Sequence, residues 1–239
     1  MIFCRLQQDK SVCMNNQSKQ CANMRQFIVI DPLCLNEDGK LVCKKPSGRH
    51  YQRAHFKQGD LDGVSCAYSL AIVFNILNAF EADDTFWNGN EHEKTTPEWK
   101  LIRSLNNPSL HPNGLNPDDI IRIVKQKYSS QVTIDHTGKK ARIPLTVKEC
   151  IDANNPVIIQ ISCSKNEVQW IVAVGYAMDA EGELLYLLTL DSRKNLPIGH
   201  FWNGILNLDR CITLKYGFQY ITDVVEMVGL DDAIIIKKR

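Results

Sequence analysis

The longest apolar segment of the chain runs from Ser65 to Phe80 and reads "SCAYSLAIVFNILNAF". It is too long for a typical strand and apolar on nearly every side, so we predict a helix that passes through the core. Asp60, Asp62 and Ser65 stand at its beginning, and these residue types suit the start of a helix.

Three other segments have a helical pattern. One covers about residues 95–105. A second opens at Pro117 as "PDDIIRIVKQKY", with acidic residues at its start and basic residues at its end, which matches the helix dipole. The third is "TVKECIDAN", residues 146–154.

Runs of β-type residues occupy much of the rest of the chain. They lie at 26–31, 41–45, 131–135, 156–162, 168–178, 183–192, 211–217, 220–228 and 233–239. Because most helices come before an extended series of strands, we expect the α+β class with an antiparallel sheet. We predict one domain over residues 26–239, preceded by a polar, weakly ordered extension over residues 1–25.

Composition excludes several classes of function. The 239 residues are 44% hydrophobic and 23% charged, with a formal net charge of +1. Lys and Arg are scattered, whereas a nucleic-acid surface needs clustered positive charge, so we expect no nucleic-acid partner. No apolar run reaches about 18 residues, so we expect no membrane span. The start of the chain lacks the apolar core of a signal peptide, which predicts a cytoplasmic protein or one exported without a conventional signal.

Cysteine is frequent but is not arranged as a metal site. The nine cysteines are an odd number, which favours reduced thiols. Cys4, Cys13 and Cys21 lie too far apart to supply the close ligand pairs of a typical zinc site. We therefore expect no metal and no other cofactor.

The start of the apolar helix could carry chemistry. The helix dipole lowers the pKa of a thiol at a helix N-terminus, and a nearby imidazolium lowers it further, so Cys66 is a candidate nucleophile. Gln58, just upstream, could donate an amide hydrogen bond to a developing oxyanion. On these residue types alone, an inert cysteine in a buried helix is an equally good interpretation.

Three segments resemble the papain-like cysteine peptidase superfamily. They are "QGDLDGVSCAYSL", "QWIVAVGY" and "LLTLDS" with a following "FWN", all within residues 58–203. The resemblance is to bacterial peptidase domains of bacteriocin exporters and to related uncharacterised papain-like proteins. It implies a papain-like α+β fold, in which an N-terminal buried helix packs on an antiparallel β-sheet.

The resemblance also implies site residues. In that family a glutamine shapes the oxyanion hole, a cysteine attacks, a histidine is the base and an Asp or Asn orients the histidine. Gln58, Cys66 and Asp191 match three of these roles, although Ser65 is an alternative at the nucleophile position. Gln169 occupies the histidine position. A glutamine amide cannot take a proton near neutral pH, so we expect hydrolysis to be impaired.

Other residues near these segments have two interpretations each. Trp170 could cover the site or belong to the core, and Trp202 and Asn203 could frame a substrate groove or serve packing. His200 or His55 could replace the missing base, although a histidine that faces solvent or is bonded locally is the simpler interpretation.

Four functions stay open on the sequence. The first is a thiol hydrolase (a peptidase, deamidase or amidase) acting on a peptide or protein, in which Gln169 is an introduced change. The second is a catalytically dead domain that binds a peptide or protein partner. The third is an enzyme that uses His200 as its base, and the fourth is an unrelated α+β binding module.

Overall fold

The structure is a computed structural model, and it describes residues 26–45, 51–58, 65–80, 101, 105, 115–163, 167–209 and 216–239. These residues form fifteen helices and strands. The predicted extension at residues 1–25 lies outside the described residues, as does the predicted helix at 95–105 except for Leu101 and Leu105. Both of these leucines are helical and buried.

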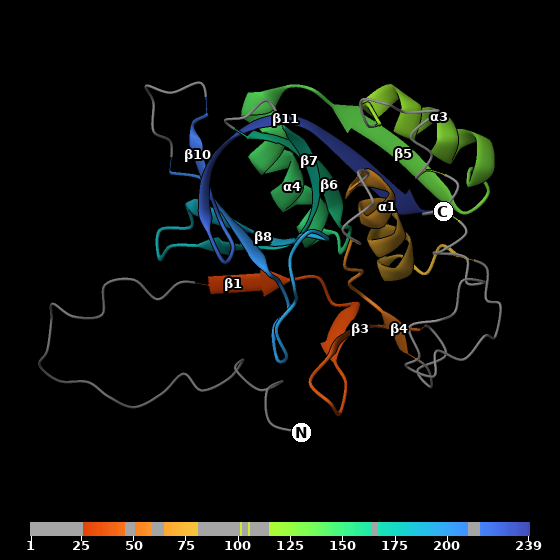
Figure 1. Cartoon of the computed structure of the whole chain (residues 1–239), viewed down its shortest axis with the longest axis horizontal. Coiled ribbons are helices and arrows are strands. Elements are labelled where there is room, and N and C mark those ends of the chain that lie inside the picture. The colour runs from red at the N-terminus through yellow and green to blue at the C-terminus, as the bar shows by residue number, and fades with distance from the viewer. Residues whose placement is uncertain are drawn as a thin grey trace, which may run out of the picture.

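A closed barrel of six antiparallel strands is the main feature of the fold (Figure 1). In order around the barrel, the strands are β7 (Val168–Met178), β6 (Val157–Cys163), β11 (Val225–Lys238), β10 (Phe218–Ile221), β9 (Gly204–Asn207) and β8 (Leu184–Leu190). Pairing of β8 with β7 closes the ring.

The predicted papain-like α+β fold, with a buried N-terminal helix packed on an antiparallel sheet, is therefore wrong. The described residues are mostly β, and their helices are short. Strand pairing is the physical reason: β7 bonds to both β6 and β8, with register shifts at Gly175 and Met178 that bend it. These register shifts let the sheet curl and close, because a bulge strengthens the local twist.

Further strands extend the barrel at two places. β1 (Gln26–Val29) pairs with β7, and β5 (Val132–Thr137) pairs with the end of β11. A separate three-stranded sheet consists of β2 (Leu33–Leu35), β3 (Leu41–Lys44) and β4 (Tyr51–Arg53). Asp38 and Gly39 lie in the turn between β2 and β3, where Gly39 has a φ of 72° that favours glycine.

Four helices pack around this framework. They are α1 (Ser65–Ile76), α3 (Pro117–Lys127), the short 3-10 helix η1 (Lys140–Arg142) and α4 (Ile143–Asp152). The predicted helix at Pro117 is confirmed, and the side chain of Asn116 caps it by accepting from the backbone N–H of Asp119 at 2.9 Å. Among the described helices, none is long and apolar enough to cross a lipid bilayer.

Helix α1 confirms the prediction of a fully buried helix, because all twelve of its residues are buried. It ends earlier than predicted. Asn78 adopts a φ of 49°, its N–H donates to the carbonyl of Asn75, and the N–H of Ala79 donates to the carbonyl of Phe74. This pair of bonds closes the last turn and stops the helix.

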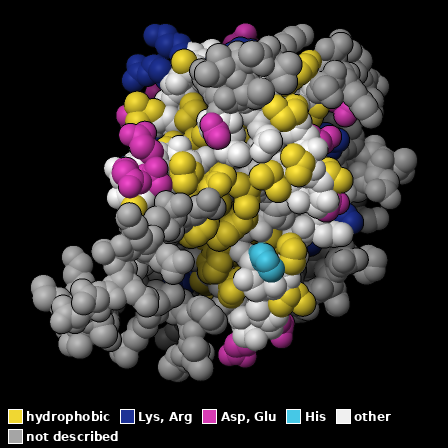
Figure 2. Space-filling model, turned by 90° about the vertical axis from the view of Figure 1, so that its left-hand side faces the viewer, with side chains coloured by type: hydrophobic (Ala, Val, Ile, Leu, Met, Phe, Trp, Pro, Cys, Tyr) yellow, Lys and Arg dark blue, Asp and Glu magenta, His cyan; other side chains and the backbone are white. Residues whose placement is uncertain are grey.

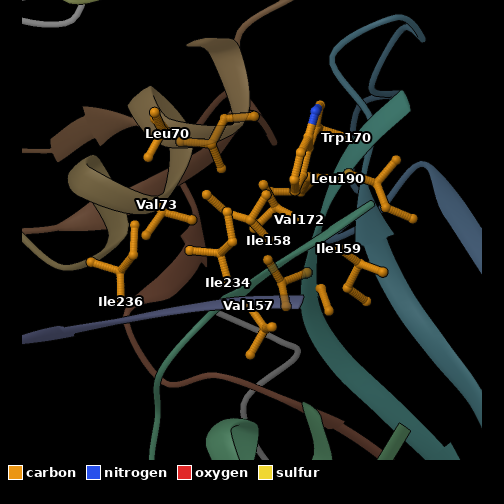
Figure 3. Packing of buried hydrophobic residues seen from close by; sticks show 14 of the residues in the cluster. Leu70, Val73, Val157, Ile158, Ile159, Trp170, Val172, Leu190, Ile234 and Ile236 are labelled. Carbon is orange, nitrogen blue, oxygen red and sulfur yellow. The ribbon is translucent and has the colours of Figure 1, made fainter. Parts of the chain in front are cut away.

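One side of the barrel packs against α1. Figure 3 shows Leu70 and Val73 of the helix pointing toward Ile158, Val172 and Ile234 of the barrel strands. Successive side chains of a strand point to opposite faces, so Gln169 and Ile171 face away from the helix, into the barrel.

The strands near the C-terminus differ from the prediction. β9 was not expected, and β11 is one strand of 14 residues where the pattern indicated two. Gly229, Asp231 and Asp232 interrupt its apolar pattern, but a register shift between Leu230 and Asp232 lets the strand continue across them.

An apolar area occupies the middle of the face that looks left in Figure 1, where β1, β8 and β10 lie. Figure 2 shows hydrophobic side chains gathered there. Phe27 of β1 is 52% exposed, and its ring stacks on that of Trp202 with centroids 5.9 Å apart. Ile198, in the same loop as Trp202, is 72% exposed.

Candidate functional site

The residues that follow β8 form a tight turn, which we call the Asp191 turn (residues 191–195). The backbone N–H of Lys194 donates to the carbonyl of Asp191 at 3.2 Å. Asn203 holds the turn from the other side. Its Oδ1 accepts from the N–H of Asp191 at 2.7 Å, and its Nδ2 donates to the carbonyls of Asp191 and Lys194.

Two residues from the segment before α1 contact this turn. The backbone N–H of Gln58 donates to the carbonyl of Ser192 at 2.6 Å. The Nε2 of His55 lies 2.9 Å from the carbonyl oxygen of Asp191. A carbonyl only accepts, so Nε2 carries the proton. Burial lowers the pKa of His55 to about 4, with a further lowering by Arg53 and an opposing effect of the bond to Asp191, so the ring is neutral at pH 7.

The carboxyl group of Asp191 lies in the barrel end and is completely buried. It accepts hydrogen bonds from the backbone N–H of Arg193 at 2.8 Å and from the hydroxyl of Tyr220 at 3.2 Å. Burial raises the pKa of Asp191. The Arg193 N–H, the Gln169 amide and the Tyr220 hydroxyl each favour the ionised form and limit the rise.

Gln169 lies across the barrel end from Asp191. Its Oε1 accepts from Nη1 of Arg193 at 3.0 Å, and Nη2 of the same guanidinium is 3.7 Å from Glu167. The Gln169 amide lies near enough to Asp191 to lower the pKa of the carboxyl, yet its Nε2 completes no hydrogen bond. Because the side chain at position 169 is not titratable, it can form hydrogen bonds with a ligand but cannot act as an acid or a base.

Two serines of α1 join the helix to the start of β7. The hydroxyl oxygen of Ser65 accepts from the backbone N–H of Trp170 at 3.0 Å, and the hydroxyl of Ser69 donates to the carbonyl of Trp170 at 3.1 Å. Ser65 is therefore hydrogen-bonded to the strand that carries Gln169.

Cys66 lies inside the hydrophobic core, with 1% of its surface exposed. Burial raises the pKa of the thiol well above its ordinary value. Among the described residues, none adds a charge that offsets this effect. A thiolate at neutral pH is what a nucleophile needs, and this environment disfavours it.

The structure thus brings Gln58, Gln169, Asp191 and Asn203 to one place, the Asp191 turn. Cys66 is buried as a member of the hydrophobic core. Trp170 is buried with its backbone against α1, and Trp202 stacks on Phe27. His200 is exposed, and its Nδ1 contacts the carbonyl of Ile198 in its own loop. The catalytic roles inferred from the family resemblance stay predictions.

Sequence reasoning missed Arg193, Tyr220 and Thr189. Arg193 gave a weak signal, because it stands two residues after Asp191 in a polar turn. Tyr220 gave none, since it lies 29 residues from Asp191 along the chain and looked like an ordinary strand residue. Thr189 joins the cluster through its hydroxyl, 3.3 Å from that of Tyr220.

Metal ligands do not gather at this site or elsewhere in the described parts of the chain. Within those parts, no group of three or more His, Cys, Asp or Glu side chains is close enough to hold a metal ion. The turn therefore offers amide, hydroxyl and guanidinium groups, which are suited to hydrogen bonding with a ligand.

Replacement of Asn203 tests whether it holds the Asp191 turn. We expect Asn203→Ala to lower the free energy of unfolding by about 2 kcal/mol, because the buried N–H of Asp191 loses its acceptor. Urea unfolding followed by circular dichroism measures this loss. The matched control is Asn207→Ala on β9, whose amide makes an exposed bond to Gln219 and should cost about 0.5 kcal/mol or less. Equal losses for both variants would show that Asn203 has no special structural part.

Comparison with models of known protein families gave no match for this chain, and comparison with curated proteins gave none either.

Proposed function

We propose that this chain is a domain that binds a peptide or protein partner and that it has no thiol hydrolase activity. The observation that carries the proposal is the position of the Cys66 sulfur, which is enclosed in the hydrophobic core. Among the described residues, no titratable side chain of the Asp191 turn forms a hydrogen bond with it. A buried thiol of raised pKa is not a nucleophile at neutral pH.

The state of the other candidate groups supports the same proposal. Gln169 accepts a hydrogen bond from Arg193, and Nε2 of His55 donates a hydrogen bond to the backbone carbonyl of Asp191. Neither side chain is arranged to take a proton from a thiol. What remains at the Asp191 turn is a set of hydrogen-bonding groups that can recognise a ligand.

The apolar area of Figure 2 is consistent with a binding role. The loop that runs from the Asp191 turn to β9 also carries apolar side chains, namely the exposed Ile198 and the ring of Trp202, which stacks on Phe27 of β1. Contiguous exposed apolar surface commonly marks a site of protein interaction.

Thiol alkylation measured by mass spectrometry tests the proposal. The native chain is treated with iodoacetamide between pH 6 and pH 9, and each cysteine is followed separately. We expect Cys66 to react far more slowly than the half-exposed Cys34 throughout this range, and to react readily only after unfolding.

The variant Gln169→His provides the matched comparison. If burial decides reactivity, adding the histidine leaves Cys66 as slow as before. Rapid alkylation of Cys66 below pH 8, in either protein, would contradict the proposal and favour the hydrolase prediction, because it would reveal an accessible thiolate.

A further inference from the structure

Unpartnered buried polar atoms concentrate at the Asp191 turn. Among the described residues, five buried side-chain atoms lack a hydrogen-bond partner, and three of them belong to this region: Oε1 of Gln58, Nε2 of Gln169 and Oγ of Ser192. The other two are on β4 and α1. Folded proteins satisfy most of their buried polar groups, so three unsatisfied atoms in one region indicate a missing partner.

Hydrogen bonds made by other atoms link the residues that carry these three atoms. Ser192 accepts the backbone bond from Gln58 at 2.6 Å, and the next residue, Arg193, donates to Gln169 at 3.0 Å. Gln169 is 2% exposed and Ser192 is 0% exposed, whereas the side chain of Arg193 is 39% exposed. Gln169 and Ser192 are therefore buried next to a residue whose side chain reaches the surface.

The orientation of the Gln169 amide follows from its neighbour. A guanidinium has donors only, so the atom that faces Arg193 is the oxygen, and the NH₂ group points away from it. This NH₂ group has two hydrogens. The amide lowers the pKa of the nearby Asp191 carboxyl as a hydrogen-bond donor, although this contact is not a complete hydrogen bond, so one of the two hydrogens is left for another acceptor.

We propose that the Asp191 turn binds a primary carboxamide, the group carried by glutamine and asparagine side chains, and this proposal rests on the binding function proposed above. Such a group has one carbonyl oxygen, which accepts from Nε2 of Gln169. It also has two N–H donors, which serve Oε1 of Gln58 and Oγ of Ser192. A carboxylate supplies acceptors only and an ammonium group supplies donors only, so each leaves one of these atoms unsatisfied.

The test uses the full chain labelled with ¹⁵N and three short peptides. The peptides are acetyl-Ala-Gln-Ala, acetyl-Ala-Glu-Ala and acetyl-Ala-Met-Ala, each closed with an N-methylamide so that only the central side chain differs in the chemistry under test. NMR titration follows the side-chain amide signals of Gln58 and Gln169. We expect saturable shifts of both signals with the glutamine peptide and about tenfold weaker binding of the other two peptides.

Variants locate the effect on the protein. Gln169→Met and Gln58→Met keep the length of the side chain and remove its polar atoms, so each should weaken the glutamine peptide by about threefold to tenfold. Gln219→Met, on the exposed face of β10, is the matched control and should leave binding unchanged. The peptide comparison on the unmodified chain does not depend on whether a variant folds.

Some results would overturn this assignment. Absence of saturable shifts would mean that ordered water satisfies the three atoms, and equal affinity for the glutamine, glutamate and methionine peptides would mean that the carboxamide is not recognised. If either result is found and Cys66 is unreactive, the carboxamide site is wrong but the proposal that the chain has no thiol hydrolase activity is still supported. A reactive Cys66 removes the proposed function itself.

Discussion

Replacement of Gly204 by alanine is expected to cost about 3 kcal/mol of unfolding free energy, because it overfills the barrel end. A Cβ at this position would overlap the hydroxyl of Tyr220 and lie 2.5 Å from Oγ1 of Thr189. Both neighbours are fixed in the core, with exposed surfaces of 1% and 0%. Moving them also breaks the hydroxyl contacts that lead to Asp191.

Urea unfolding of Gly204→Ala against Gly182→Ala measures this effect. Gly182 has a φ of 87° and open space around it, so alanine there suffers backbone strain without a clash and should cost about 1 kcal/mol. In the double variant with Tyr220→Phe, which removes the overlapping hydroxyl, part of the Gly204→Ala loss should be recovered. If the two glycine variants lose equal stability, crowding at the barrel end is not the cause.

Acidification from pH 7 to pH 4 is expected to remove about 3 kcal/mol of stability through His55. The folded pKa of His55 is lowered to about 4 from its ordinary value of 6.5, because the ring is buried. Between these values the unfolded chain binds more protons than the folded chain. The contribution of the neutral His55 ring to the free energy of unfolding is therefore complete above pH 6.5 and is lost as the pH falls toward 4.

Urea unfolding at intervals between pH 7.5 and pH 4 measures the loss, and the variant His55→Gln isolates it. Glutamine presents an N–H at the position of the imidazole Nε2 but does not titrate, so its stability should fall much less with acid. Asp191 acts in the opposite direction, since its folded pKa is raised by burial and its protonation favours the folded chain at low pH. Asp191 is present in both proteins, so its effect cancels when the stability of His55→Gln is subtracted from that of the unmodified chain. Identical pH profiles of the two proteins would contradict the role of His55.

These two results concern the structure that holds the Asp191 turn. Gly204 and Tyr220 shape the inside of the barrel end, whereas His55 and Asn203 fix the backbone outside it. The carboxamide proposal depends on this rigidity, because binding through a few hydrogen bonds requires groups that are already held in place. Variants that loosen the turn should therefore weaken the glutamine peptide even when they remove none of its direct partners.

Local pattern determined the helices and most strands of this protein. The apolar run at Ser65 produced α1, and Pro117 with its acidic neighbours produced the start of α3. Such signals lie within a few residues of the element that they specify, so a single sequence contains them. The gathering of Gln58, Gln169 and Asp191 was also expected, from the resemblance of three segments to the papain-like superfamily.

Only the tertiary structure decided that the sheet closes and which groups surround Cys66. Closure depends on β8 pairing with β7 and on register shifts along β7 and β11, which involve residues far apart in the chain. All twelve residues of α1 are buried, and a helix that is apolar all round does not indicate which side chains surround the Cys66 sulfur. A nucleophile and an inert core thiol therefore look alike in the sequence and differ only once the helix is packed.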